Sequence, residues 1–196
     1  MTVDLAALVS SRICHDLISP IGAISNGVEL ISLTAAQDTA EMSLISQSVE
    51  AANARIRFFR IAFGTATPGQ SVSRSEIGGI LDAMTATGRT RLAWQVPTNP
   101  DRATARLVFL ALLCLETAMP GGGDVTVTEQ DNRWTLDASA PRIALDPALW
   151  GPLTGDGTLP DLAPAQVQFA LIREALAMSQ RHLTMTTGDG LVMLRF

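Results

Sequence analysis

His15 is the residue in this sequence whose type and neighbours best suit chemistry. An acid follows directly at Asp16, a hydroxyl residue at Ser19 and a proline at Pro20. Asp16 could orient the imidazole or act as a base, and it could equally be an ordinary charge on a helix surface. An exposed histidine is usually only a polar surface residue, and these neighbours set His15 apart.

The spacing of apolar residues around His15 predicts an amphipathic helix. Apolar residues recur every three or four positions, which is the period of a helix with one buried side. On a helical wheel His15 lies about 180° from the centre of this stripe, so its imidazole should face solvent where another protein can reach it. Pro20 lies inside this helix and frees the backbone carbonyl of Asp16. The stripe consists of Ile13, Leu17, Ile21, Ile24, Val28 and Ile31, and small or polar residues surround His15 at Ser11, Ser19, Gly22 and Asn26.

A second helix should follow the first and return beside it. We expect the first helix to run from about residues 2–4 to Leu33, and residues 34–37 to connect it to the second. Asp38 and Glu41 resemble a capping box, and an apolar stripe then runs from Met42 to Phe63, with Gly64 as a possible C-cap. A helical hairpin alone leaves much of both stripes in water. We therefore expect a homodimer that forms a four-helix bundle, with packing on the rest of the chain as the alternative.

The remaining chain predicts a mixed α/β domain. Residues 65–72 are rich in Gly, Pro, Ser and Thr and suggest a linker, after which Ser73 and Glu76 suggest a capping box that opens a helix. Residues 141–163 show no clear period. Helices that alternate with hairpins indicate a mixed sheet covered on one face. The expected strands are 91–96, 124–130, 133–140, 182–187 and 191–196, with turns at Asp131-Asn132 and at residues 188–190, and the expected later helices are 102–118 and 164–179.

Composition narrows the classes of function. Of the 196 residues, 47% are hydrophobic, which is enough for a proper core. All basic residues are arginine and the net charge is −5, so no broad basic surface for nucleic acid is expected. No run approaches the roughly 20 apolar residues of a membrane helix, and no secretion signal is evident, so we expect a cytoplasmic protein that does not bind membranes. Cys14 and Cys114 suggest neither a disulfide nor a metal site.

The residues around His15 resemble a known phosphorylation motif. The run from His15 to Pro20 resembles the phospho-acceptor box of dimeric histidine kinases, and the longer run from Cys14 to Gly27 resembles the ChpT-type histidine phosphotransferases of alphaproteobacterial phosphorelays. The run from Arg57 to Gly64 is similar to the end of the second helix in that family, whose hairpin dimerises. The resemblance implies an α+β protein, with a dimeric four-helix bundle formed by residues 1–64, a linker at 65–72 and a degenerate Bergerat domain, similar to the ATPase domain of histidine kinases, at 73–196.

The nucleotide-binding residues of the Bergerat family are missing. That family carries two asparagines on a helix before a turn of proline and glycine, and counting back from Pro120 puts Leu110 and Cys114 at those places. Neither is the hard oxygen ligand that magnesium needs. The next family motif should fall near residues 137–142, where Asp137 is present without the glycines. We therefore expect no cofactor and no metal on this chain.

The resemblance implies a carrier of phosphate on His15. Phosphate would pass from the receiver domain of a hybrid histidine kinase to His15 and on to receiver domains of response regulators, which bring their own Mg²⁺. The protein would then be an enzyme only in the sense of moving phosphate between proteins, without an ATP-dependent kinase activity of its own. The alternatives are a scaffold or inhibitor of kinases and response regulators that carries no phosphate, and an ATP-dependent kinase fragment. The candidate partner-binding residues are Leu8, Ser11, Ile18, Ser19, Gly22 and Asn26.

The remaining polar candidates for function are three arginines on the second helix and the second histidine of the chain. Arg55, Arg57 and Arg60 could meet an acidic partner, although a solvated face is the favoured interpretation. His182 is expected to be structural. Leu8 and Ile18 could instead be partly buried within the helical bundle.

Overall fold

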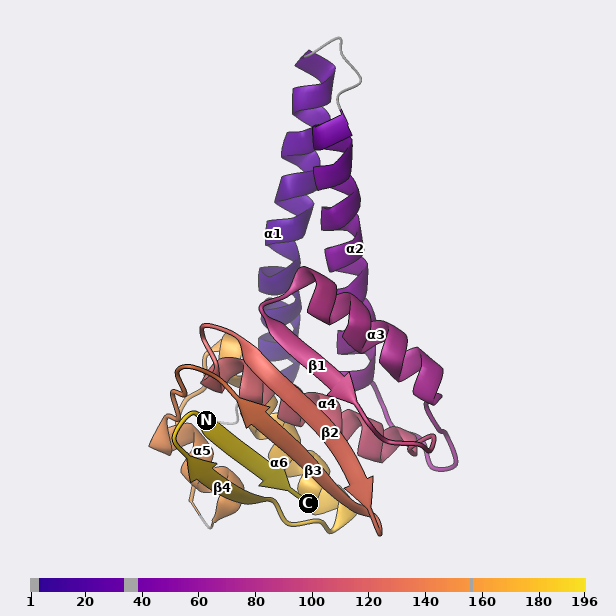
Figure 1. Ribbon diagram of the computed structural model, residues 1–196. Helices are drawn as coiled ribbons and strands as arrows, with labels where there is room; N and C mark the ends of the chain where they lie inside the picture. The colour runs from indigo at the N-terminus through magenta and orange to yellow at the C-terminus, as the bar shows by residue number, and fades with distance from the viewer. Residues whose placement is uncertain (1–3, 34–38, 156) are drawn as a thin grey trace.

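A long helical hairpin extends from a mixed α/β part (Figure 1). The computed structural model describes residues 4–33, 39–155 and 157–196. Helix α1 spans Leu5–Leu33 and helix α2 spans Thr39–Ala62, and they run antiparallel side by side. The α+β class with an N-terminal helical hairpin is therefore confirmed. The predicted connector at 34–37 and the capping residue Asp38 lie outside the described residues.

Local signals explain where the hairpin helices begin and end. The Asp4 carboxylate accepts a hydrogen bond of 3.1 Å from the Ala7 backbone N–H, which caps the first turn of α1. Pro20 lies within α1, and the helix continues past it. Helix α2 ends at Ala62, two residues before Gly64, and the φ angle of Gly64 is not positive. Gly64 is therefore not the left-handed cap that the sequence suggested.

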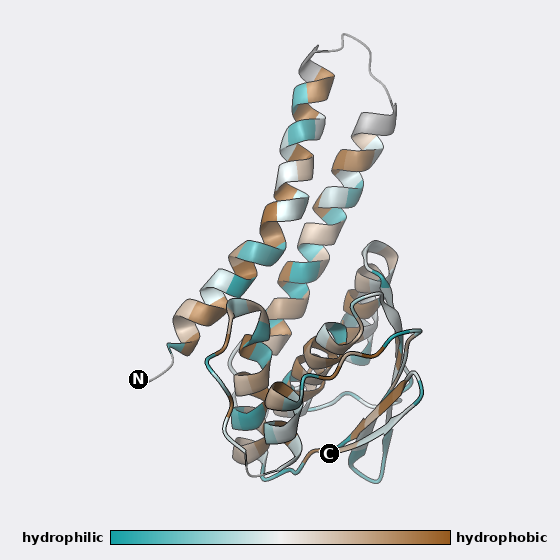
Figure 2. Cartoon of the chain, turned by 90° about the vertical axis from the view of Figure 1, so that its left-hand side faces the viewer, coloured by the Kyte–Doolittle hydropathy of each residue, from teal (hydrophilic) through white to brown (hydrophobic). Residues whose placement is uncertain are grey.

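One copy of the chain does not bury the whole apolar stripe of α1. Ile13, Leu17 and Ile24 are half-buried, whereas Ile21 is 56% exposed and Val28 is 54% exposed. Exposure of Ile21 and Val28 in a single copy agrees with the expectation that a hairpin alone leaves part of its stripe in water, because α2 covers only one side of α1. Apolar bands are visible along both hairpin helices, away from the α/β part (Figure 2).

The stripe of α2 is divided in the same way. Met42, Val49 and Ile56 are exposed, but Phe59 is buried and stacks on Phe63, with ring centroids 4.9 Å apart. The C-terminal end of α2 thus belongs to the core of the α/β part. Packing on the rest of the chain, the alternative to a dimer, accounts for this end of the hairpin only.

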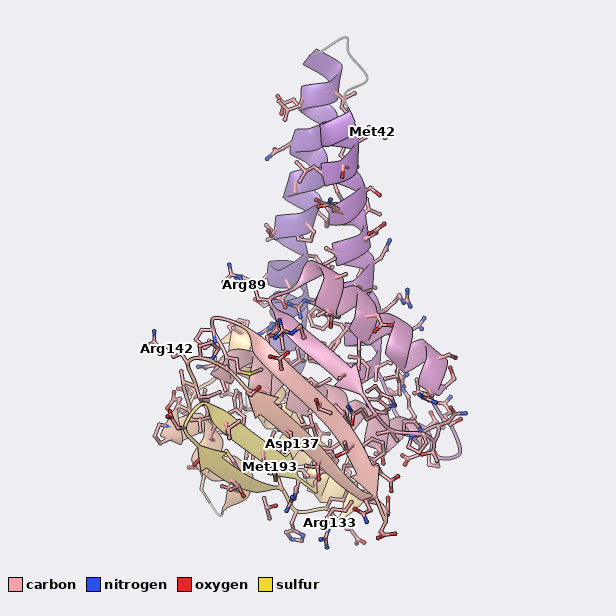
Figure 3. The ribbon with its side chains drawn as sticks, viewed as in Figure 1. Met42, Arg89, Arg133, Asp137, Arg142 and Met193 are labelled. Atoms are coloured by element: carbon pink, nitrogen blue, oxygen red, sulfur yellow. The ribbon has the colours of Figure 1, made fainter. Side chains whose placement is uncertain are left out.

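A five-stranded mixed sheet organises the rest of the chain. Its strand order is β1-β2-β3-β5-β4, with β1 parallel to β2 and the other neighbours antiparallel. Buried residues alternate along β3, and helices α4 and α6 lie behind the sheet in Figure 1. Asp137 and Met193, which are partners in the β3–β5 register, lie on the opposite, uncovered face (Figure 3). The elements are α3 (Arg74–Thr87), β1 (Thr90–Trp94), α4 (Arg102–Ala118), β2 (Gly123–Gln130), β3 (Arg133–Ser139), α5 (Pro147–Thr154), the 3₁₀ turn η1 (Pro164–Gln166), α6 (Val167–Ser179), β4 (Thr184–Gly188) and β5 (Leu191–Arg195).

Short-range sequence signals place several of these elements. Ser73 Oγ accepts a hydrogen bond of 3.1 Å from the Glu76 backbone N–H and caps α3, although the Glu76 carboxylate pairs with Arg60. Asp131 and Asn132 both have positive φ, as the tight turn between β2 and β3 requires. Helix α5 was not predicted. Its cap, Asp146 followed by Pro147 in the first turn, is the signal that could have revealed it.

Helix α4 forms the centre of the core. Every residue from Leu107 to Leu115 is buried, as expected of a helix that is apolar on all sides and covered by the sheet, α2 and α6. Phe58 of α2 packs on Phe109 of α4 with ring centroids 4.6 Å apart. The hairpin and the α/β part therefore share one hydrophobic core. Within the described residues, no helix is both long and apolar enough to cross a membrane.

The Phe58–Phe109 contact predicts a large stability effect. Phe109→Ala should lower the free energy of unfolding by about 3–5 kcal/mol, because it leaves a cavity at a fully buried position. Urea denaturation followed by circular dichroism measures this. Met178→Ala is the control, since Met178 is exposed, and it should change the free energy by less than about 0.5 kcal/mol. Equal effects of the two substitutions would contradict the shared core.

Candidate functional site

His15 lies on an exposed side of α1. Its side chain is 79% exposed, so a partner can reach the imidazole. Ser11, Ser19 and Asn26 are also exposed, and Gly22 is half-buried two turns further along. The chain therefore presents a surface of small polar residues around the imidazole, as the helical spacing predicted.

A hydrogen bond to Asp16 orients the His15 ring. His15 Nδ1 lies 3.1 Å from Asp16 Oδ1. A carboxylate oxygen accepts hydrogen bonds, so the ring proton of the neutral imidazole is assigned to Nδ1. The lone pair is then on Nε2, at the outer edge of the ring. This arrangement leaves Nε2 as the nucleophilic nitrogen.

Asp16 is not a solvated surface charge. Its side chain is only 10% exposed and lies between two guanidinium groups. Arg12 Nε donates to Asp16 Oδ2 at 3.0 Å, and Arg55 Nε forms an ion pair with the same oxygen at 3.8 Å. Both carboxylate oxygens of Asp16 are therefore engaged, one by the arginines and the other by His15.

The two arginines are in turn anchored on the α/β part. Arg12 Nη1 donates to the backbone carbonyl oxygen of Ala165 in η1 at 2.6 Å. Arg55 donates two hydrogen bonds, of 3.1 and 2.9 Å, to the carboxylate of Glu116 in α4. Burial by itself would lower the pKa of Arg55, but the hydrogen bonds and charge of Glu116, with the charge of Asp16, raise it. Arg55 thus remains cationic between two carboxylates.

Sequence reasoning missed most of this network. The expectation of a solvated face is wrong for Arg55, which is half-buried and pairs with Glu116. It is right for Arg60, which is 65% exposed although its guanidinium lies 2.8 Å from the Glu76 carboxylate. Arg57 is exposed. Arg12 lies four residues before Asp16 on one helix, and this spacing is a recognisable signal for an ion pair. Glu116 and Ala165 carried no local signal.

The two apolar candidates for partner binding lie in different surroundings. Ile18 is 69% exposed, one turn after His15. Leu8 is half-buried and packs against the core, so the alternative of partial burial describes it. Of this pair, Ile18 alone offers an exposed apolar side chain beside the imidazole.

A groove opens beside Asp16 between the hairpin and the α/β part. It has a volume of about 750 Å³. Asp16, Ser19 and Arg55 line it from the hairpin, and Arg89 and Glu116 line it from the opposite side. Arg89 lies near the base of the hairpin in Figure 3. The groove leaves room for part of a partner that approaches His15.

The positions at which the resemblance would place nucleotide ligands hold core residues. Leu110 and Cys114 are fully buried in α4, and burial raises the pKa of the Cys114 thiol. Asp137 lies on the uncovered face of the sheet (Figure 3). Among the described residues, no group of three or more His, Cys, Asp or Glu side chains could hold a metal ion. His182 is exposed and precedes β4, apart from the His15 network.

Comparison with known proteins identifies the family. Residues 74–190 match the model of the histidine phosphotransferase C-terminal domain. The protein phosphotransferase ChpT of Brucella abortus (strain 2308) is 33% identical over 155 residues, which cover 74% of this chain and 72% of that protein. A solved bacterial phosphotransferase superposes with a TM-score of 0.82 and 26% identity, covering 100% of this chain and 96% of its own. The chain belongs to the histidine phosphotransferase family.

Proposed function

We propose that this protein carries phosphate on His15 between the receiver domains of a two-component phosphorelay. The observation that carries the proposal is the exposed imidazole whose Nδ1 side is held by Asp16, which leaves Nε2 free to react. Family membership supports the same function. No observation favours the alternative of a scaffold that is never phosphorylated.

The chemistry requires two successive transfers. Nε2 of His15 attacks the phosphorus of an aspartyl phosphate in line, the N–P bond forms, and the P–O bond to the donor carboxylate breaks. Asp16 accepts the hydrogen bond from Nδ1–H and stabilises the positive charge that develops on the ring. The carboxylate of a second receiver then attacks the phosphohistidine and restores the neutral imidazole. We propose that Mg²⁺ comes with the receiver, since its acidic pocket supplies oxygen ligands that the described residues of this chain do not bring together.

The partner surface is proposed to comprise Ser11, Ile18, Ser19, Gly22 and Asn26. Gly22 supports this assignment. A glycine within a helix lowers helix stability by about 1 kcal/mol relative to alanine. A Cβ added at Gly22 would have no heavy atom within 4 Å outside the neighbouring backbone of its own helix. The chain itself does not require glycine there, whereas the close approach of a partner helix would.

We further propose that residues 1–64 form the transfer and dimerisation domain and that residues 73–196 support it. Exposed apolar side chains continue along both hairpin helices, and their burial in a second copy would contribute about 1.5–3 kcal/mol for each fully buried side chain. A four-helix bundle made from two hairpins would cover them. They include Ile21, Val28, Met42, Leu44 and Val49.

Replacement of His15 tests the phosphate carrier. His15→Ala should abolish transfer from a phosphorylated receiver and leave the fold intact, because an exposed helical position tolerates alanine. Phosphotransfer from labelled receiver domains to the purified protein measures this. His182→Ala should transfer at the normal rate. Acid-labile, base-stable label on the His15→Ala variant would falsify the assignment, and receiver binding without any exchange of phosphate by the unmodified protein would favour the scaffold.

Charged substitutions on the uncovered hairpin side test the dimer. Ile21→Glu combined with Val49→Glu should convert the dimer to a folded monomer, because both side chains are exposed in one copy and need not be buried for it to fold. Sedimentation velocity together with circular dichroism measures this. The matched control is Met178→Glu on α6, also at an exposed apolar side chain, and it should remain dimeric. A monomeric unmodified protein would contradict the proposal.

Nucleotide binding tests the third alternative, a kinase fragment. Titration with Mg–ATP in a calorimeter should give no saturable binding at micromolar concentration, and incubation with labelled ATP should not label His15. The reason is that Leu110 and Cys114 offer no oxygen ligand and lie in the core. Saturable binding together with self-phosphorylation would revive the kinase interpretation.

A further inference from the structure

The α/β part reaches Asp16 along two separate routes. On the first, the Ala165 carbonyl oxygen accepts from Arg12, whose Nε donates to Asp16. On the second, the Glu116 carboxylate holds Arg55, whose Nε lies 3.8 Å from Asp16. Arg12 and Arg55 come from different helices of the hairpin and converge on Asp16 Oδ2. The other oxygen of Asp16 is left for His15.

The two anchors on the α/β part are themselves connected. Gln168 is fully buried in α6, and its Nε2 donates to the Ala165 carbonyl at 3.0 Å and to Thr117 Oγ1 at 2.9 Å. Thr117 is the residue after Glu116 on α4. The carbonyl that holds Arg12 and the helix that carries Glu116 are thus fixed to one another by a buried side chain.

We propose that the α/β part positions the phospho-acceptor, with Glu116 and Arg12 as positioning residues that act on His15 through Asp16. The inference deepens the proposed function, on which it rests, by giving a role to a domain that lacks the ligands for nucleotide. The arginines hold the Asp16 carboxylate in one rotamer, and the carboxylate holds the imidazole with its proton on Nδ1. When this restraint is released, the ring rotates and its proton moves mainly to Nε2, as in an unrestrained histidine, and the nucleophilic lone pair is lost from the outer edge.

Glu116→Gln is the decisive variant. It keeps the size of the side chain, which is 39% exposed, but removes the charge that holds Arg55. Transfer from a phosphorylated receiver should slow by about tenfold, because a misplaced nucleophile loses its in-line geometry. The ring-nitrogen shifts of His15 in a long-range ¹H–¹⁵N spectrum should move toward the tautomer with its proton on Nε2. The chain has two histidines, and the signals of His182 should stay unchanged as the internal reference.

Glu76→Gln is the matched control. Glu76 is 37% exposed and also joins the α/β part to the hairpin, through Arg60, but this pair does not reach Asp16. It should leave both the His15 tautomer and the transfer rate unchanged. Asp16→Asn gives the second control, because Glu116 can act on His15 only through Asp16. The double variant Asp16→Asn with Glu116→Gln should therefore transfer no more slowly than Asp16→Asn alone.

Three results would overturn the inference. They are a Glu116→Gln protein with the unmodified tautomer and rate, an equal slowing by Glu76→Gln, and additive effects in the double variant. Failure of the proposed function has a different signature. In that case the unmodified protein would not accept phosphate from any receiver, whereas the ring-nitrogen spectra would still show whether Glu116 controls the His15 tautomer.

Discussion

The packing of Phe58 against Phe109 is the contact on which the rest of the structure depends. It inserts the end of α2 into the core around α4, and the hairpin is therefore held in one orientation relative to the sheet. Arg55 lies about one turn before Phe58 on α2, so the same packing brings its guanidinium to Glu116. The polar network at His15 is thus set by an apolar contact, because hydrophobic burial provides the free energy of packing and the ion pairs fix the position of the hairpin.

Much of the fold could be predicted because its signals are local. The turn at Asp131 and Asn132 and the cap at Ser73 depend on residues close in sequence, and the structure contains both. His15 could be placed on an exposed helix side for the same reason, since helical period alone decides it. The apolar stripes told less about burial. The helical period places Ile21 on the apolar side of α1, but it does not show whether another helix of the same copy covers that side.

The support of the candidate site could not be predicted in this way. Arg12 and Ala165 are 153 residues apart in sequence, and Arg55 and Glu116 are 61 apart. Nothing within a few residues of Glu116 indicates that it faces the hairpin, since that depends on how α4 is rotated within the core. Helix α5 was missed for a different reason, because its two prolines and its short length hide the helical period. Long-range packing, rather than propensity, determines these features.

The complete burial of Leu110 and Cys114 also bears on how this protein can evolve. An asparagine at either place would put an amide into a closed core, and each unpaired polar group there costs about 1–3 kcal/mol. A substitution that placed an oxygen ligand at either position would therefore lower stability unless the core around α4 also opened. The packing of α4 thus opposes a gain of ATP chemistry by single substitutions.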